Sequence, residues 1–225
     1  MMISVIIPVY NESKRINEIL ESVKSASCGV KYEIIVADGD PSGSTIKLIV
    51  EHGIIKIKAP KGRALQMNSA AARASGDILL FLHADTILPD NAFSKIIEAL
   101  SDKRFIGGAF DLGIRNRKLI FRIIGVTASL KHRITRVPYG DQAIFMLKSY
   151  FNDLGGYPEI PLMEDVELMK RVKRNGGRII ILPEATATSS RKWETDGVIY
   201  TIIRNWIIQA LYMFGVPAER FVKYY

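Results

Sequence analysis

Two aspartates stand where short apolar runs end in the first half of the chain. Asp38 closes the run Glu33–Asp38, and Asp85 follows the run Ile78–His83. The carboxyl ends of parallel strands lie along one edge of an open α/β sheet, and such folds bind their ligands at that edge, so both carboxylates are candidate ligand-binding groups. The alternative for either aspartate alone is a structural role in capping a helix or forming a turn.

A second group of acidic residues stands at the start of a helical pattern in the second half. Glu164, Asp165 and Glu167 come first, and Lys or Arg residues follow between positions 170 and 174. Acids in the first turn and cations in the last turn complement the helix dipole. A carboxylate at this position can also act as a general base, but on the residues alone the structural interpretation is the simpler one.

The loop after the first apolar run, Pro8 to Glu12, lacks the glycines of a dinucleotide-binding turn. A Gly-x-Gly-x-x-Gly sequence would be needed there for the backbone to approach a pyrophosphate. The chain also lacks the Gly-x-x-x-x-Gly-Lys-Ser/Thr sequence of a P-loop. A Rossmann dehydrogenase and a P-loop nucleotidase are therefore both disfavoured.

An alternation of short apolar runs and helical patterns must position these groups in the first half. Each helical pattern is long enough to cross over the sheet and return the next strand in parallel, as in the βαβ layer of nucleotide-binding folds. The predicted strands are Ile3–Val9, Glu33–Asp38, Ile54–Lys58 and Ile78–His83, and the predicted helices lie near residues 12–27, 43–52, 63–75 and 90–101.

The second half is less regular but continues the same sheet. Strands are predicted at Gly107–Leu112, Gln142–Leu147 and Arg178–Leu182, and a helix begins near Glu164. No linker rich in Pro, Gly or Ser divides the chain, and no internal repeat is present. One domain with a C-terminal appendage is therefore the economical interpretation.

The composition is that of a globular protein with one sizeable core. The chain has 225 residues, 48% of them hydrophobic and 24% charged, which excludes a disulfide miniprotein and a disordered tail. The single cysteine, Cys28, has no partner for an internal disulfide, and no charge-free run reaches eighteen apolar residues. The first nine residues are typical of a core strand rather than a cleavable signal. We expect a cytoplasmic protein that does not span a membrane.

The formal net charge of +8 is concentrated in one half. Residues 1–112 contain 13 Lys and Arg and 13 Asp and Glu, whereas residues 113–225 contain 18 and 10. No nucleic-acid partner is expected, because the chain has no zinc-finger spacing, no RNP-type aromatic cluster and no basic recognition helix. An anionic small ligand or the anionic surface of a membrane fits the bias better.

Two stretches of the second half are candidate amphipathic helices. Between Arg115 and Arg136, seven Lys or Arg and no acid are interleaved with apolar residues, and between Val198 and Phe214 nearly every residue is apolar. Packing in the core or in a homodimer interface would explain both stretches, and a helix lying on a membrane surface would explain them as well. The second stretch contains Arg204 and is short for a transmembrane span.

Four motifs occur in the order that is typical of family 2 glycosyltransferases, and the resemblance covers almost the whole chain. The motifs are Ser4–Glu12 (SVIIPVYNE), Ile35–Gly39 (IVADG), Leu80–Thr86 (LFLHADT) and Met163–Asp165 (MED). The resemblance is sharpest to a bacterial and archaeal subgroup, the arsenosugar-biosynthesis or selenodomain-associated glycosyltransferases. The stretches similar to that subgroup are Gly62–Asn68, Tyr139–Gln142 and Ser190–Glu194.

The resemblance implies the GT-A fold, an α/β architecture with a Rossmann-like, mostly parallel sheet flanked by helices, here followed by C-terminal amphipathic helices. It implies a glycosyltransferase domain over residues 1–194 and a helical appendage over residues 195–225. Within the domain, the nucleotide-sugar half would cover about residues 1–112 and the acceptor half about residues 113–194.

The resemblance also implies a nucleotide-binding set. Asp38 would contact the base, since a carboxylate can accept a hydrogen bond from a ring N–H group. Gly62 and Arg63 open a helix, where backbone N–H groups and a guanidinium can together face a diphosphate. The full set is Pro8, Tyr10, Glu12, Asp38, Gly62, Arg63 and Asn68.

A divalent metal, Mg²⁺ or Mn²⁺, is the cofactor that the resemblance implies. Asp85 matches the second acid of the family's Asp-x-Asp motif, which holds a cation that bridges the diphosphate. One carboxylate together with phosphate oxygens can suffice for a hard cation. His83 replaces the first acid of that motif, so it is a candidate Mn²⁺ ligand, a donor to the diphosphate or a residue that merely ends the strand.

Asp165 matches the catalytic base, which in an inverting transfer takes the proton from the acceptor hydroxyl. Further residues are implied on the acceptor and diphosphate side of the cleft. They are Gly108, Asp141, Gln142, Glu164, Arg191 and Trp193.

The implied function is a metal-assisted, inverting transfer of a sugar from a nucleoside-diphosphate sugar, with UDP favoured, to an acceptor that the sequence does not identify. The charge bias favours a lipid-linked acceptor reached from the inner face of a membrane. The alternative is a non-catalytic module of the same fold that binds a nucleotide sugar or a membrane surface, and only His83 in place of an acid supports it. A sugar nucleotidyltransferase would need a Gly-rich, Arg-containing loop after the first strand, which this chain lacks.

Overall fold

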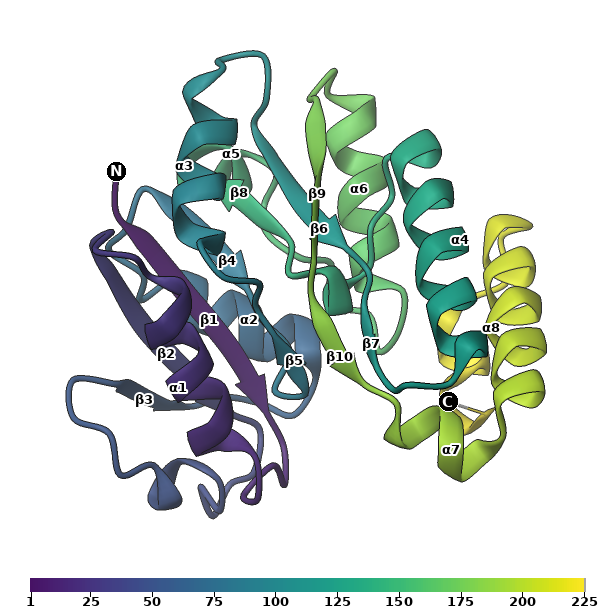
Figure 1. Ribbon diagram of the computed structural model, residues 1–225, viewed down its shortest axis with the longest axis horizontal. Coiled ribbons are helices and arrows are strands. Elements are labelled where there is room, and N and C mark those ends of the chain that lie inside the picture. The colour runs from purple at the N-terminus through teal and green to yellow at the C-terminus, as the bar shows by residue number, and fades with distance from the viewer. Residues whose placement is uncertain (225) are drawn as a thin grey trace.

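Seven strands form the central sheet, in the order β3-β2-β1-β4-β8-β6-β9 (Figure 1). The computed structural model describes residues 1–224. Strands β1 to β4 are parallel, β8 is antiparallel to both of its neighbours, and β9 runs parallel to β6, which confirms the mostly parallel sheet. The bounds are β1 Ile3–Val9, β2 Tyr32–Asp38, β3 Ile55–Lys58, β4 Ile78–Phe81, β6 Gly107–Asp111, β8 Phe145–Leu147 and β9 Ile179–Ala185.

The central strand β1 shows why the first half folds in layers. All seven of its residues are buried, as expected for a parallel strand that helices cover on both faces. Successive side chains point to opposite faces, so Ile7 packs into the core formed with α1 and α3, while Ile6 packs into the core formed with α2 and α6. The bounds of these helices are α1 Ile16–Ala26, α2 Arg63–Ala71, α3 Ala92–Ser101 and α6 Glu164–Arg174.

A second, smaller sheet joins segments from both halves of the chain. Its order is β5-β10-β7, with bounds Thr86–Ile87, Ala187–Ser189 and Ile114–Arg115. The sequence does not predict these strands, because two or three residues carry no readable alternation of apolar and polar side chains. They fix the chain immediately after Asp85, whose carbonyl oxygen accepts a hydrogen bond from the Ser189 N–H group at 3.1 Å.

The remaining helices lie in the second half. Helix α5 (Lys148–Asp153) follows β8, and the short helix α7 (Arg191–Asp196) leads into α8 (Val198–Met213). Helices α4 (Leu119–Thr135) and α8 run side by side at the end of the molecule opposite β3 (Figure 1), and Lys131 Nζ of α4 donates a hydrogen bond to Gln209 Oε1 of α8. The two amphipathic stretches are therefore helical. Among residues 1–224, no helix combines the length and the apolar character that crossing a membrane requires.

The predicted helix at residues 43–52 is wrong. That segment holds a single 3-10 turn, η1 (Ile46–Leu48), inside otherwise irregular backbone. The cause is the carboxylate of Asp38, which is fully buried and accepts hydrogen bonds from the backbone N–H groups of Asp40, Thr45 and Ile46 at 2.9, 3.0 and 3.2 Å. These bonds fold the loop back over the end of β2.

This geometry also corrects the role that the resemblance implied for Asp38. Both carboxylate oxygens are bonded to loop backbone, and the side chain has no exposed surface with which to contact a base. In the structure Asp38 shapes the loop after β2 instead.

Replacing Asp38 with alanine removes the acceptor of three backbone N–H groups. A buried donor left without a partner costs about 1–3 kcal/mol, and water will reach part of the opened loop, so we expect the free energy of unfolding to fall by about 2–3 kcal/mol. Urea unfolding followed by circular dichroism measures this change. Asp40→Ala is the control, because that carboxylate lies in the same loop and accepts hydrogen bonds from Ser42 near the surface. Equal losses in the two variants would contradict the assignment.

Candidate active site

A cluster of acidic side chains forms where the carboxyl edge of the sheet meets the second half of the chain. His83 and Asp85 follow β4, Asp141 lies in the 3-10 turn η2 (Gly140–Gln142), and Glu164 and Asp165 open α6. The contacts and electrostatic couplings described below place these groups together. The ligand-binding edge predicted for Asp85 is therefore shared with the acids of α6.

Asp165 is the most constrained member of the cluster. The residue is 6% exposed, its Oδ2 atom accepts a hydrogen bond from the Gly140 N–H group at 2.9 Å, and its Oδ1 atom is buried without a hydrogen-bond partner among the described residues. Burial raises the pKa of this carboxyl to about 7, and the neighbouring charge of Glu164 raises it further while Arg63 opposes the shift. A carboxyl group in this state can take up or release a proton near neutral pH.

Gly140 lets a histidine approach the same carboxylate. A Cβ atom at position 140 would collide with Nε2 of His83 and lie 3.0 Å from Asp165 Oδ2, so a glycine is required for both groups to reach this point. Burial lowers the pKa of His83 to about 4, and the charge of Arg63 lowers it as well. The imidazole is therefore neutral at pH 7, and its buried Nε2 has no hydrogen-bond partner among residues 1–224.

An ion pair joins the start of α2 to the start of α6. Arg63 Nε lies 2.7 Å from Glu164 Oε1, and the Glu164 side chain is only 1% exposed. Gly62, which precedes the helix with φ 140°, adopts a backbone conformation that side chains disfavour. Arg63 therefore neutralises Glu164 while about a third of its own side chain remains exposed.

Further charged groups face Asp85. Burial raises the pKa of Asp141 to about 6, and the negative charge of Asp85 adds to that shift. Burial also raises the pKa of Glu12, an effect that Arg191 of α7 opposes and Asp85 reinforces. Burial lowers the pKa of Lys192 to about 8. Helix α7 therefore brings cations of the second half to the acids at the ends of β1 and β4.

The residues present suit a divalent cation, although the described part of the chain holds no group of three or more His, Cys, Asp and Glu side chains placed to enclose a metal. Asp85 is partly exposed, and the buried Oδ1 atom of Asp141 has no hydrogen-bond partner among those residues. Carboxylate oxygens are the donors that a hard cation prefers, and His83 offers a neutral nitrogen beside them. Such a cation would need further oxygen atoms from a ligand.

Residues 4–152, more than half of the chain, match the sequence model of the family described as glycosyl transferase family 2. The chain belongs to that family. Among curated relatives, it is 32% identical over 108 residues to a dolichol-phosphate mannosyltransferase from Pyrococcus furiosus, an alignment that covers 45% of this chain and 31% of the relative. The chain thus spans only about a third of the length of the first family 2 relatives that it matches.

Two solved glycosyltransferase structures share the fold. S. aureus TarS 1–349 in complex with UDP-GlcNAc superposes with a TM-score of 0.62 at 20% identity, over 84% of this chain and 58% of that TarS fragment. A mannosyltransferase from Pyrobaculum calidifontis in complex with GDP-Man and Mn²⁺ superposes with a TM-score of 0.61 at 20% identity, over 83% of this chain and 56% of that enzyme. The predicted GT-A fold is confirmed.

The structure brings together eight of the sixteen predicted site residues of this family 2 chain. The ring of Tyr10 is 41% exposed and has the ammonium group of Lys61 4.2 Å from its centre. Trp193 lies on α7 and is partly buried, and Pro8 is buried inside β1. The residues linked by the contacts and charges above are Glu12, Arg63, His83, Asp85, Asp141, Glu164, Asp165 and Arg191.

Three predicted site residues serve the fold instead. Gln142 is buried, donating to the carbonyl oxygen of Phe110 and accepting from the Tyr139 N–H group. Gly108 lies inside β6, where a Cβ atom would collide with the backbone of β9, so it permits sheet packing rather than approach of an acceptor. The side-chain amide of Asn68 donates a hydrogen bond to the carbonyl oxygen of Tyr157 and accepts one from the Tyr157 N–H group, at 2.9 Å each.

Tyr157 lies against the acidic cluster, and its place there was not predicted from the sequence. Its fully buried ring packs edge-on against Phe81, and burial together with the nearby charges of Asp165 and Glu164 holds the pKa of its hydroxyl well above its usual value. The glycine pair before it, Gly155 and Gly156, was the available signal, since both adopt positive φ angles and Asn68 closes against the second.

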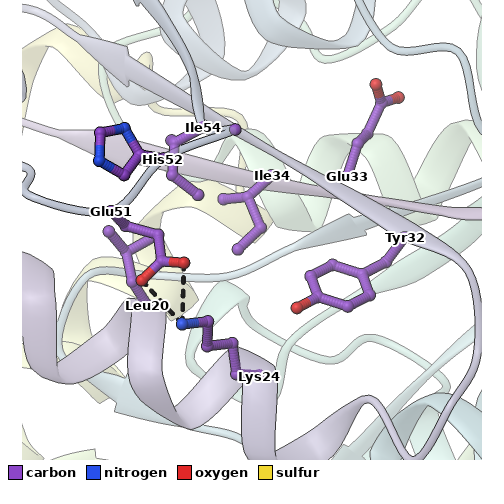
Figure 2. Close-up of a pocket in the computed structure, with 9 residues that line it drawn as sticks. Leu20, Lys24, Tyr32, Glu33, Ile34, Glu51, His52 and Ile54 are labelled. Atoms are coloured by element: carbon purple, nitrogen blue, oxygen red, sulfur yellow. Dashed lines mark hydrogen bonds and ion pairs between the residues drawn. The ribbon is translucent and has the colours of Figure 1, made fainter.

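A separate surface pocket lies away from this site. It has a volume of about 190 Å³ and is lined by residues of α1, β2 and the loop before β3 (Figure 2). Tyr32 and Glu33 stand at the beginning of β2, so this pocket is at the amino edge of the sheet. Two of the lining residues, Lys24 and Glu51, form an ion pair of 2.8 Å (Figure 2).

The raised pKa of Asp165 makes stability depend on pH. Because the folded state holds the proton more tightly than the unfolded chain does, the contribution to stability is present at low pH and is lost as pH rises from about 4 to about 7. At 1.36 kcal/mol per pKa unit the full loss is about 4 kcal/mol. Asp165→Asn should therefore be more stable than the wild type at pH 8, and the difference should shrink towards pH 4.

Thermal unfolding at a series of pH values measures this difference, with Asp153→Asn, an exposed acid at the end of α5, as the control. A difference between Asp165→Asn and the wild type that does not change with pH would contradict the buried, raised pKa.

Proposed function

We propose that this chain transfers a sugar from a nucleoside-diphosphate sugar to an acceptor hydroxyl group, with inversion at the anomeric carbon. The observation that carries the proposal is the geometry of Asp165. One of its oxygens is fixed by the Gly140 N–H group, the other is buried without a partner among the described residues, and its pKa is raised to about 7. Family membership and the GT-A fold support the same activity.

In this proposal Asp165 is the general base. Its carboxylate takes the proton of the acceptor hydroxyl while the hydroxyl oxygen forms a bond to the anomeric carbon. The bond from that carbon to the diphosphate oxygen breaks on the opposite face, and its electron pair leaves with the nucleoside diphosphate. Gly140 holds the carboxylate in place, and the neutral His83 adds no positive charge that would lower the basicity of Asp165.

The leaving diphosphate carries negative charge that needs cations already in position. Arg63 at the start of α2, and Arg191 and Lys192 at the start of α7, are the side chains suited to this task. A divalent cation held by Asp85, with Asp141 or His83 as further donors, would add positive charge at the diphosphate. The P. calidifontis mannosyltransferase, which is similar in fold and was solved in complex with Mn²⁺, supports this assignment.

In this proposal the two halves of the chain bind different substrates. Glu12, Tyr10, Arg63 and Asp85 belong to residues 1–112, which we propose bind the donor, whereas Asp141 and Asp165 belong to residues 113–194, which we propose receive the acceptor. A UDP-sugar is the donor we favour, because TarS is similar in fold and binds UDP-GlcNAc, with a GDP-sugar as the second choice. We also propose that the chain belongs to the arsenosugar-biosynthesis or selenodomain-associated subgroup, which the sequence of Gly62–Asn68 resembles.

A nucleoside diphosphate should stabilise the protein when a divalent metal is present. A ligand at a hundred times its dissociation constant adds about 2.7 kcal/mol, which raises the melting temperature by several degrees in a protein of this size. Thermal shift with UDP, GDP, CDP, dTDP and ADP, each with and without Mn²⁺ or Mg²⁺, identifies the nucleotide. Asp85→Ala should lose the metal-dependent part. Asp90→Ala, an exposed acid in the loop before α3, should keep it.

Asp165→Asn should lower the transfer rate by about a hundredfold or more while nucleotide binding is kept, because a general base contributes about 10²–10⁴. In the wild type the rate should rise with pH through about 7, since the carboxyl has to be ionised. Release of the nucleoside diphosphate from a UDP-sugar, with and without candidate acceptors, measures the rate. Binding without turnover in the wild type would favour the non-catalytic module, and equal turnover in Asp165→Asn would reject this residue as the base.

A further inference from the structure

An exposed apolar surface covers the outer faces of α4 and α8 in the part of the chain that the structure describes. On α4 the exposed residues Leu119, Ile123, Val126 and Leu130 recur at helical spacing, while the opposite face, including Phe121, is buried against the fold. On α8 the exposed residues include Ile203 and Trp206, the latter 71% exposed. We call these exposed apolar faces the α4–α8 surface. Soluble monomers rarely expose so many neighbouring large apolar side chains, so this surface contacts something.

The charges around this surface have one sign. Between residues 112 and 140 the sequence contains seven Lys or Arg and no Asp or Glu, and Arg117, Lys118 and Arg122 are exposed at the beginning of α4. A groove of about 390 Å³ opens there, and both arginines line it together with apolar residues such as Leu119 and Val126. Apolar contact and cation-mediated binding of anions are therefore available side by side.

Helix α8 complements this arrangement with an uncharged outer face. The only charged residue between 198 and 213 is Arg204, which is 9% exposed and pairs with Asp196 at 2.8 Å. Tyr200 and Trp206 are exposed on this helix. Aromatic side chains of these two types are enriched at the boundary between lipid and water.

We propose that the α4–α8 surface docks on a membrane that carries anionic phospholipid head groups. The apolar side chains would enter the boundary between head groups and acyl chains, and Arg117, Lys118 and Arg122 would contact lipid phosphates. A second copy of the chain is the poorer occupant, because a symmetric contact would face the cations of one α4 with those of another, and this segment contains no acid to pair with them.

Docking in this way would also hold the candidate active site next to the membrane. Helix α7 directly precedes α8, with only Gly197 between them, and Arg191 and Lys192 of α7 act on the charges of Glu12 and Asp85. The surface and the site are therefore connected through one short helix. Membrane docking goes beyond sugar transfer, and its test does not depend on whether the chain transfers a sugar.

Flotation of the full chain with vesicles tests the proposal. The wild type should float with vesicles made of equal parts phosphatidylglycerol and phosphatidylcholine at low salt. Its binding to pure phosphatidylcholine vesicles should be weaker by about tenfold or more. Val126→Asp and the double variant Arg117→Glu/Arg122→Glu should each lose about tenfold or more in binding to the anionic vesicles. Val50→Asp is the matched control, because Val50 is a valine at least as exposed as Val126 that lies within residues 1–112, outside α4 and α8.

Fluorescence provides a second readout. Emission should shift to shorter wavelength when anionic vesicles are added, and Trp206→Phe should abolish that shift. A wild type that stays out of anionic vesicles at low salt overturns the proposal. Flotation of the Arg117→Glu/Arg122→Glu variant as strong as that of the wild type overturns the role of the anionic head groups. Light scattering without vesicles that shows a dimer in the wild type and a monomer in Val126→Asp assigns the surface to a second copy instead.

Discussion

The hydrogen bond from the Gly140 N–H group to Asp165 Oδ2 is the contact on which the acidic cluster depends. It joins the turn η2 to the first turn of α6, and it forms only because Gly140 has no side chain to collide with His83. Neither segment alone would place a carboxylate here, since Met163 must adopt a left-handed conformation, with φ 67°, for α6 to begin at this point. The position of the candidate base is thus set by backbone geometry rather than by its own side-chain preferences.

The cluster concentrates negative charge in a region that excludes water. Asp165 and Glu164 are buried side by side, Asp141 lies nearby, and Arg63 is the cation that compensates them most directly. Such an arrangement lowers the stability of the folded state, and the two apolar cores on either side of the sheet offset this cost. Electrostatic strain of this kind is common where a protein binds a ligand that relieves it, and a bound cation would do so here.

The sequence predicted the central sheet well, because buried parallel strands are continuous apolar runs that few other structures explain. The strand end pointed to Asp85 and the family resemblance pointed to Asp165, and the structure places both in the acidic cluster. Prediction from the sequence failed where a polar side chain binds backbone far away in the chain. Asp38, Asn68 and Gln142 each satisfy backbone groups that become buried only in the folded state, and no local pattern reveals which groups will lack a partner.

The small sheet β5-β10-β7 has a consequence for the order of folding. Thr86 pairs with Thr188 about a hundred residues away, and their hydroxyl groups share a hydrogen bond of 3.2 Å. Contacts between such distant segments form late, because closing a long loop lowers the conformational entropy of the chain before the contact contributes any favourable free energy. While the chain is being synthesised, strands β1 to β4 can pair with one another, but the loop after Asp85 acquires its final shape only once residue 189 has left the ribosome.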